Sequence, residues 1–182
     1  MTTRAEAAAA TRERILETAL EQFLAHWYDE VTVAGIAKAA GVSQQTIVNH
    51  FGSKDGLLEA AVDRLDPASD RDRFADPVEG IVADYESTGD PILRFLALED
   101  RMPALRPLLE TGRAAHRAWT ERAFAHRLPA DGAQRERALD LHVIATDVFT
   151  WKLLRRDMGK SRADTVDAMR ALVDALTTPP HP

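Results

Sequence analysis

Primary amide side chains are concentrated in one short stretch of the chain, at Gln44, Gln45 and Asn49. An amide offers a donor and an acceptor side by side, the pattern that pairs with an adenine edge in the DNA major groove. Val48 directly precedes Asn49, and its methyl groups could contact the methyl group of a thymine. Side chains of these types could read bases if one helix presents them together, away from the core.

Groups that bind phosphate oxygens surround the amides. Hydroxyl, imidazole and ammonium groups hold a protein on a nucleic-acid backbone without reading its sequence. Here they belong to Thr32, Ser43, Thr46, His50 and Lys54. The chain has a formal net charge of −6, yet residues 31–54 contain two lysines and no Asp or Glu. We therefore expect this stretch to present DNA with a surface without carboxylates.

A turn between two short helices would hold these side chains. Gly41 stands where a helix C-terminus needs a left-handed residue, and Thr32 and Ser43 stand where helices need N-caps. The small side chain of Ala37 permits a close helix crossing. Apolar residues recur with helical spacing on both sides of the glycine. They are Val33, Ile36, Ala37, Ala40, Val42, Ile47 and Phe51. The pattern predicts a helix-turn-helix, whose second helix enters the major groove.

The other patterns in the 182-residue chain are helical as well, which predicts an all-α fold of about nine helices. A first helix of about four turns begins at Thr11, after residues 1–10, which we expect to fray. After the helix-turn-helix, patterns cover 53–65, 77–88, 91–101, 107–126, 134–157 and 161–176. The polar stretch 67–76 predicts a boundary between an N-terminal helix-turn-helix domain, residues 1–66, and a second helical domain, residues 67–182.

Composition argues against several classes of protein. The chain has no cysteine, so disulfides, thiolate metal sites and cysteine nucleophiles are excluded. No run of apolar residues approaches the length of a membrane span, and the N-terminus lacks the apolar core of a signal peptide. We therefore expect a cytoplasmic protein that does not enter a membrane.

An enzyme is the first alternative to a DNA-binding protein. The sequence has no glycine-rich phosphate loop and no serine elbow, and His116 and His142 lack a third ligand at metal spacing. We therefore assign no catalytic residue, metal or cofactor and predict that the chain is not an enzyme. A second alternative is an interaction protein that uses the helix-turn-helix only for packing, and a gel shift with DNA separates these interpretations.

The N-terminal pattern resembles the tetracycline repressor (TetR) family of bacterial transcription regulators, from Ile15 to Leu65. The residues that carry the resemblance are Thr32, Ile36, Ala37, Ala40–Ser43, Thr46, His50–Phe51 and Lys54–Leu58. The run TDVFTWKLLRRD, residues 146–157, is similar to a sequence that recurs in actinobacterial members. Two positions depart from the family: Trp27 stands where glycine is common, and Val48 stands where an aromatic residue usually bonds a phosphate. The resemblance implies a repressor that binds a pseudo-palindromic operator as a homodimer and is released by a small-molecule effector.

The resemblance implies that the second domain binds the effector and forms the dimer. A largely apolar effector would lie between core-facing residues, with space left by a glycine inside a helix. These residues are Gly112, His116, Trp119, His142, Thr146, Phe149 and Thr150. The alternative is an ordinary core in which the histidines are satisfied by hydrogen bonds.

The last two helices are the expected dimer interface, because small residues permit close packing into an intersubunit four-helix bundle. The interface residues would be Val166, Ala168, Ala171, Leu172, Ala175 and Leu176. The alternative is that this stripe packs within one chain.

Overall fold

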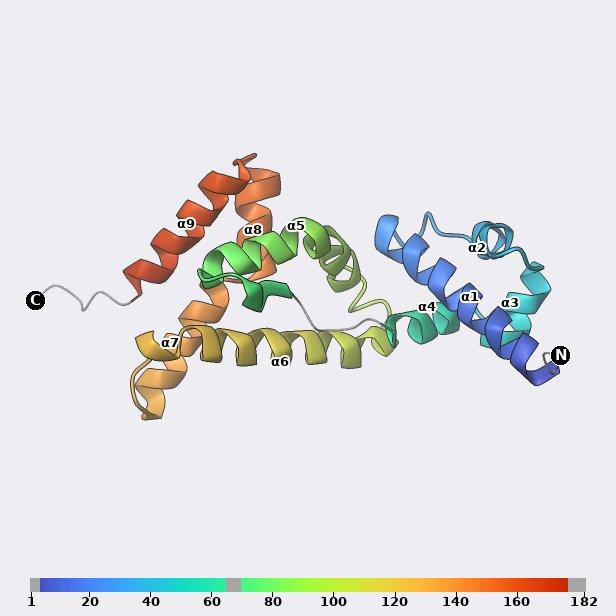
Figure 1. Ribbon diagram of the computed structural model, residues 1–182, viewed down its shortest axis with the longest axis horizontal. Helices are drawn as coiled ribbons and strands as arrows, with labels where there is room; N and C mark the ends of the chain where they lie inside the picture. Colours follow the sequence, from blue (N-terminus) through green and yellow to red (C-terminus); the bar gives the residue numbers. More distant parts are fainter. Residues whose placement is uncertain (1–3, 65–69, 177–182) are drawn as a thin grey trace, which may run out of the picture. The chain divides into compact units, whose positions relative to one another are not determined.

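The computed structural model describes residues 4–64 and 70–176, and in these ranges the chain forms helices and no strand (Figure 1). The predicted all-α fold is confirmed. The chain divides into two compact units, one of Met1–Asp66 with Arg94–Leu108 and one of Pro67–Leu93 with Leu109–Pro182. The predicted domain boundary, between Asp66 and Pro67, lies outside the described residues. The first unit differs from the predicted domain because it includes residues 94–108.

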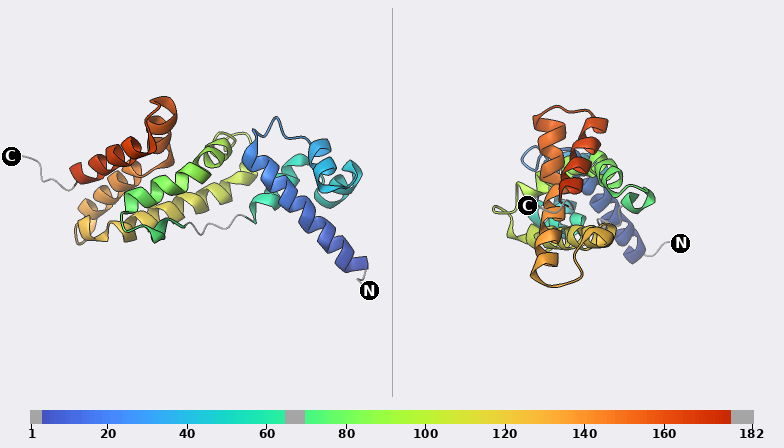
Figure 2. Two further views of the ribbon diagram at one scale, coloured as in Figure 1. Left: turned by 45° about the horizontal axis from the view of Figure 1, so that its top comes forward. Right: turned by 90° about the vertical axis from the view of Figure 1, so that its left-hand side faces the viewer.

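The first unit contains four helices from the N-terminal part of the chain. They are α1 (Arg4–Ala25), α2 (Val33–Ala40), α3 (Gln44–Phe51) and α4 (Lys54–Val62). Helix α1 packs against α2 and α4, and α3 packs against α2 and α4 (Figures 1 and 2). Buried apolar side chains from all four helices form a small core. Its members include Ile15, Leu16, Ala19, Phe23, Ile36, Ile47, Leu57 and Leu58.

Helix α1 is longer than predicted, because it begins at Arg4 and not at Thr11. The prediction that residues 4–10 fray is wrong, and residues 1–3 lie outside the described residues. Alanine has the highest helix propensity, and Glu6 lies in the first turn, where a carboxylate favours the helix dipole. An alanine-rich segment can therefore continue a helix without burying an apolar face.

Residues 94–108 complete the first unit. Here the chain leaves helix α5 and makes a 3-10 turn at Pro103–Leu105 before α6 begins. The side chains of Phe95, Met102 and Leu105 are buried. The guanidinium group of Arg94 donates to the Leu24 carbonyl in the last turn of α1. This contact satisfies one of the carbonyls that a helix C-terminus leaves without a partner.

The second unit is built from the remaining helices and a single π-helical turn. They are α5 (Pro77–Leu96), α6 (Arg106–Ala123), α7 (Gly132–Ala145), α8 (Val148–Lys152), the π-helical turn Leu153–Asp157 and α9 (Arg162–Ala175). Helix α9 packs against α7 and α8 (Figure 1). Asp76 caps α5, because its carboxylate accepts the Val78 N–H at 2.9 Å. The same carboxylate accepts the Arg170 Nε of α9 at 3.0 Å, which ties the two helices together.

Helix α5 replaces the two helices predicted over 77–88 and 91–101. Pro91 lies inside it and Asp90 does not cap a new helix. A proline inside a helix loses one hydrogen bond, and contacts of its neighbours can offset that loss. Asp90 accepts two hydrogen bonds from Arg156, and Gly89 lies so close to the ring of Trp151 that an added Cβ would be 2.5 Å from its Cζ3. Tertiary contacts therefore continue the helix through the proline.

The helix predicted over 134–157 is divided between α7 and α8. The Thr146 hydroxyl donates to the His142 carbonyl at 2.8 Å, and the Asp147 carboxylate accepts the Phe149 N–H at 2.8 Å. Asp147 is thus the N-cap of a new helix, although neither glycine nor proline marks the break. Two predicted helices thus form the single helix α5, and one predicted helix forms the two helices α7 and α8. These two errors cancel in the predicted number of helices.

Candidate nucleic-acid interface

The turn between α2 and α3 has the geometry that its sequence predicts. Gly41 adopts φ 65° and ψ 38°, a left-handed conformation that glycine enters without the Cβ penalty. The Val42 N–H then donates to the Ala37 carbonyl at 2.9 Å and closes the end of α2. Ser43 is extended, and its Oγ accepts the Thr46 N–H at 3.1 Å to begin α3. Both capping predictions for this turn are confirmed.

Helix α2 is fixed at both ends to the rest of the first unit. Thr32 Oγ1 accepts the Gly35 N–H at 3.0 Å, as predicted for its N-cap. Arg14 of α1 donates from Nε to the Ala40 carbonyl at 3.0 Å. Ile36 and Ala37 are buried at the crossing between the helices. Helix α2, against which α3 packs, is therefore held in place by the core, by its caps and by a side chain of α1.

Helix α3 buries one side and exposes the other. Ile47 is only 1% exposed, whereas the side chains predicted to meet DNA lie on the outer face. These exposed residues are Gln44, Gln45, Val48, Asn49 and His50. The Gln45 Nε2 donates to the Asn49 Oδ1 at 2.8 Å, so the two amides form a pair one turn apart. The face thus presents amide groups around one aliphatic side chain.

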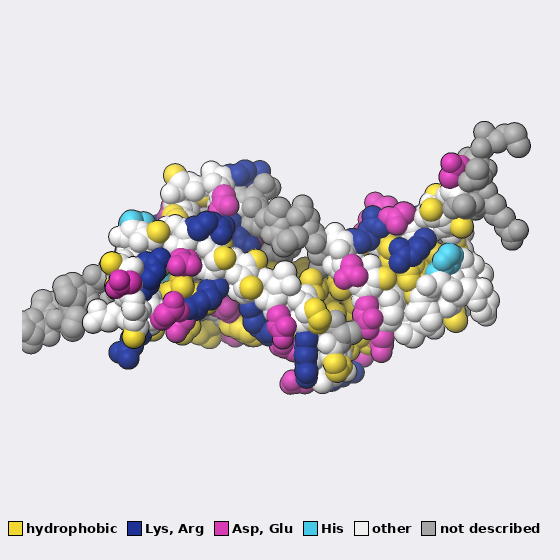
Figure 3. Space-filling view, turned by 90° about the horizontal axis from the view of Figure 1, so that it is seen from below, with side chains coloured by type: hydrophobic (Ala, Val, Ile, Leu, Met, Phe, Trp, Pro, Cys, Tyr) yellow, Lys and Arg dark blue, Asp and Glu magenta, His cyan; other side chains and the backbone are white. Residues whose placement is uncertain are grey.

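The residues predicted to bind phosphates lie at helix N-termini and along α3. Thr32, Ser43 and Lys54 are at the starts of α2, α3 and α4, where backbone N–H groups favour anions. Thr46 is half-buried, and its hydroxyl lies 2.9 Å from the Ser43 hydroxyl. On the face drawn in Figure 3, basic and acidic side chains are interspersed over the protein surface. Helix α3 itself carries no Lys, Arg, Asp or Glu.

Lys54 has a structural role that its sequence context did not reveal. Its Nζ donates to the carbonyls of Tyr28 at 2.6 Å and Val31 at 2.7 Å, and lies 3.9 Å from the centre of the Tyr28 ring. The Tyr28 hydroxyl donates to the Asp55 carboxylate. Burial, and then that carboxylate, raise the pKa of Tyr28, so the phenol keeps its proton. Lys54 therefore clamps the link between α1 and α2, and its contact with phosphate stays a prediction.

Comparison with known proteins agrees with this geometry. Residues 15–61 match the family described as bacterial regulatory proteins, tetR family. Residues 15–61 therefore belong to the TetR family. The matched residues run from α1 into α4 and contain the whole α2–turn–α3 segment.

Curated relatives of this chain are regulators in several bacteria. RaaS of Mycobacterium tuberculosis is 50% identical over 50 residues, which cover 28% of this chain and 23% of RaaS. AlkX of the same organism is 30% identical over 123 residues, 58% of this chain and 56% of AlkX. UidR of Escherichia coli is 35% identical over 71 residues, 39% of this chain and 36% of UidR. The chain thus matches less than two thirds of the length of each of these relatives.

A solved TetR-family structure shares the fold over nearly the whole chain. The TetR-family transcriptional regulator from Streptomyces coelicolor superposes with a TM-score of 0.66 and 22% identity. The superposition covers 93% of this chain and 82% of that chain. The fold of the second unit is therefore also found in the family, although sequence similarity is concentrated at the N-terminus.

Four of the predicted effector residues come together between α6 and α7. They are His116, Trp119, His142 and Thr146. The His116 Nε2 lies 3.3 Å from the Thr146 hydroxyl, and its ring stacks on Trp119 with centroids 5.9 Å apart. Within the described residues, the buried Nδ1 of His116 and Nε2 of His142 have no hydrogen-bond partner. Burial lowers the pKa of His116, so this imidazole is a neutral group.

The other three predicted effector residues do not join this cluster. Gly112 is exposed on α6 with open space where a Cβ would be, and Phe149 is 56% exposed. Thr150 is half-buried, and its hydroxyl donates to the Ile144 carbonyl at 2.6 Å. The break before Asp147 places Phe149 and Thr150 on a different side from the one that a continuous helix would have given them. Gly112 lies on the outward side of α6 and does not face the core as predicted. An effector-binding role of these three residues stays a prediction.

The predicted dimer residues divide between two sides of α9. Ala168, Ala171, Leu172 and Ala175 form an outward stripe with helical spacing, and Leu172 is 47% exposed. Val166 is only 8% exposed and belongs to the inward stripe with Met169 and Val173, so its place in a dimer interface stays a prediction. Leu176 is half-buried. The exposed apolar side chains of Ile144 and Leu153 were not predicted from the sequence, and Phe149 faces outward and not toward the core.

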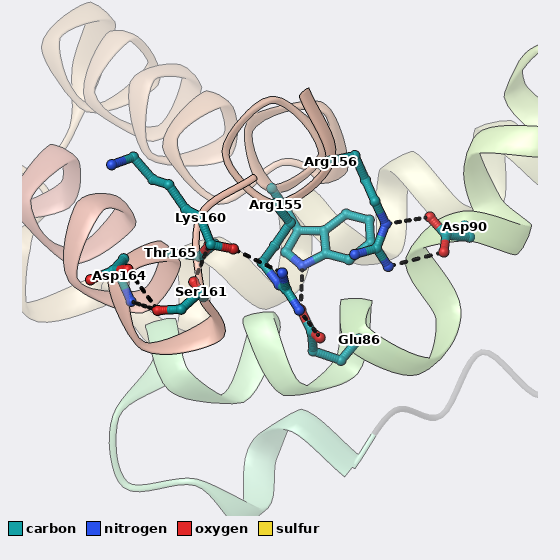
Figure 4. Close-up of polar contacts among 9 residues, drawn as sticks. Glu86, Asp90, Arg155, Arg156, Lys160, Ser161, Asp164 and Thr165 are labelled. Carbon is teal, nitrogen blue, oxygen red and sulfur yellow. Dashed lines mark hydrogen bonds and ion pairs between the residues drawn. The ribbon is translucent and has the colours of Figure 1, made fainter. Parts of the chain in front are cut away.

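A cluster of charged side chains fixes α5 to the segment that follows α8 (Figure 4). Arg155 and Arg156 bind Glu86 and Asp90, which lie one turn apart on α5. Arg155 also donates to the Lys160 carbonyl at 2.8 Å, directly before the Ser161 cap of α9. Ser161 Oγ accepts the Asp164 N–H at 3.1 Å and caps the start of α9. The cluster therefore positions the start of α9 relative to α5.

Two further observations concern other kinds of site. In residues 4–64 and 70–176, no three His, Cys, Asp or Glu side chains gather in a way that could hold a metal ion. None of the helices in the same described ranges is long and apolar enough to span a bilayer.

Proposed function

We propose that this TetR-family chain is a transcriptional repressor that acts in the cytoplasm. It binds a pseudo-palindromic operator in double-stranded DNA as a homodimer, and a largely apolar small molecule releases it. The observation that carries the proposal is the outer face of α3, where Gln44, Gln45, Val48 and Asn49 are exposed and capped turns hold the helix in place. Such a helix can enter the major groove. No catalytic role is assigned to any residue.

A homodimer is proposed because one such helix makes few DNA contacts, and a two-fold arrangement doubles them. The apolar stripe of α9 around Leu172 and the exposed side chains of Phe149 and Leu153 support this assembly. Helices α8 and α9 pack on each other, so their outer surfaces can form one interface. A second copy of the chain would cover these apolar groups.

An effector is proposed for the cluster between α6 and α7. The unpaired imidazole nitrogens of His116 and His142 support it, because a buried polar atom without a partner is costly unless a ligand or water satisfies it. A ligand that prefers the dimer with its α3 helices at the wrong spacing would lower operator affinity by linkage. A screen for compounds that raise the melting temperature tests this, because a binder of the folded state stabilises it.

A gel shift with the DNA upstream of the chain's own gene tests the proposed function. The wild-type chain should retard this duplex in the presence of excess unrelated DNA. The double variant Gln45→Ala with Asn49→Ala should lose that specific retardation. Gln134→Ala, which removes an exposed glutamine from α7, is the matched control and should bind like the wild type. Failure of the wild type to bind any DNA would refute the proposal and favour an interaction protein.

A further inference from the structure

Helix α3 lacks the side chains that most often read G·C pairs. Arg and Lys pair with O6 and N7 of guanine, and Asp and Glu accept a hydrogen bond from N4 of cytosine. The eight residues Gln44–Phe51 contain none of these four types. The face that α3 exposes offers amides and one aliphatic side chain instead. The base edges that suit these groups are the adenine edge and the thymine methyl group.

The hydrogen bond between Gln45 and Asn49 determines what the two amides offer to DNA. It uses one donor of Gln45 and one acceptor position of Asn49. The pair therefore keeps a carbonyl acceptor on Gln45 and N–H donors on Asn49. If the nitrogen and oxygen of both amides are exchanged, the acceptor lies on Asn49 and the donors on Gln45, so the pair still offers one acceptor beside donors. Adenine presents the N6 donor beside the N7 acceptor, which matches this combination. Guanine itself presents two acceptors, so at a G·C pair the carbonyl could find a donor only on N4 of the paired cytosine, on the other strand.

Val48 adds an apolar contact point to the same face. It is 44% exposed, and it lies one turn from Gln44 and on the same side of α3 as Gln45. The core contact of α3 is made by Ile47, so the Val48 side chain is available to a partner. Its methyl groups are suited to the 5-methyl group of thymine, which the other bases of DNA lack.

We infer that the half-site read by α3 contains an adenine bound by the Gln45–Asn49 pair and, next to it, a thymine whose methyl group contacts Val48. The inference rests on the proposed function and names the base chemistry that the surface selects. Val48 is then a specificity-determining residue of this chain.

The inference is tested in two steps. In the first, the chain selects the duplexes that it binds from a pool of random sequences. The enriched half-site should contain adjacent A·T pairs. In the second step, each thymine of that half-site is replaced by deoxyuridine, and each adenine by 7-deaza-adenine, one position at a time. One deoxyuridine should raise Kd about fourfold, the effect of losing one buried methyl group. One 7-deaza-adenine should raise Kd about tenfold, the lower range for a lost base contact.

Variants separate a methyl contact from a general loss of affinity. Val48→Ala should raise Kd for the thymine duplex about fourfold. In this variant, deoxyuridine at the position that was sensitive in the wild type should no longer change Kd. Val48→Ile keeps a methyl group at the contact and should retain the deoxyuridine effect, and Gln134→Ala should retain it fully. Deoxyuridine that is neutral at every thymine, or an enriched half-site of G·C pairs, would overturn the inference while leaving the proposed function intact. If no sequence is enriched, the proposed function fails and the inference with it.

Discussion

Arg155 and Glu86 form a bidentate ion pair between the π-helical turn and α5, with an Nε–Oε1 distance of 2.8 Å and an Nη2–Oε2 distance of 3.0 Å. The same carboxylate accepts the indole N–H of Trp151 at 3.1 Å. One turn along α5, Asp90 binds Arg156, whose guanidinium group lies 4.5 Å from the centre of the Trp151 ring. These contacts fix the segment that carries Phe149 and Leu153, so they position part of the proposed dimer interface.

Replacing Arg155 by alanine should lower the free energy of unfolding by about 1–3 kcal/mol, because Glu86 and the Lys160 carbonyl would each lose a charged donor. Both side chains of the pair are roughly a quarter exposed, so water compensates only in part. Urea denaturation measures the loss. Arg137→Ala, at an exposed position of α7, is the control and should change stability by less than about 0.5 kcal/mol. Equal losses in both variants would contradict a structural role for Arg155.

Two glycines inside helices should respond in opposite ways to alanine. At Gly89 the new Cβ would be 2.5 Å from the Trp151 ring, so Gly89→Ala should destabilise the protein by about 1–3 kcal/mol. At Gly112 no atom lies within 4 Å of the new Cβ, so Gly112→Ala should stabilise it by about 0.5–1 kcal/mol. Thermal unfolding of the two variants checks both signs. Stabilisation by Gly89→Ala would contradict the close packing of Trp151 on α5.

The features that the sequence predicted correctly depend on neighbours in the chain. The caps at Thr32 and Ser43 each bind an N–H three residues away, and Gly41 closes the helix that directly precedes it. The outer face of α3 follows from the same local rules, because the burial of Ile47 places the amides on the opposite side. Local spacing therefore predicted the helix-turn-helix and its candidate DNA-binding face.

The features that could not be predicted depend on residues far apart in the sequence. Asp90 looks like a cap before proline, but Arg156, 66 positions later, binds its carboxylate. Lys54 looks like a phosphate ligand, but its ammonium group is held by carbonyls 23 and 26 positions earlier. At the break between α7 and α8, only the polar side chains of Thr146 and Asp147 mark the new helix. A continuous apolar pattern concealed that break and led to the wrong prediction for Phe149.

Replacing Leu172 by glutamate should convert the proposed dimer to a monomer, because a carboxylate would be buried against apolar groups of the second copy. Size-exclusion chromatography with light scattering gives the mass directly. Trp27→Glu introduces the same charge at an exposed aromatic residue of the first unit and should leave the mass unchanged. A wild-type chain that is monomeric at micromolar concentration would contradict the dimer.

Stability should fall as the pH is lowered through the range in which His116 titrates. Burial keeps the pKa of His116 below its ordinary value of 6.5, so the unfolded chain binds the proton more tightly than the folded chain. The free energy of unfolding therefore rises with pH between the folded and unfolded pKa values and declines below about pH 6.5. The lowered pKa values of Asp76 and Glu86 act at more acid pH.

Urea denaturation between about pH 5.5 and 7.5 checks this dependence. His116→Gln should flatten the slope of stability against pH, because glutamine does not titrate. Gln134→Ala, at an exposed position of α7 that carries no titratable group, should keep the wild-type slope. A slope that is unchanged in His116→Gln would show that this imidazole is not the source.

Hydroxyl-radical footprinting of the full-length chain on its selected duplex tests most directly that two copies of α3 read the major groove. Two protected segments related by a two-fold axis are expected, with centres separated by one helical turn of about 10 base pairs or a multiple of it. Gln45→Ala with Asn49→Ala should abolish both segments, and Gln134→Ala should preserve both. A single protected segment, or protection that survives in the double variant, would show that the chain does not bind DNA through a pair of α3 helices.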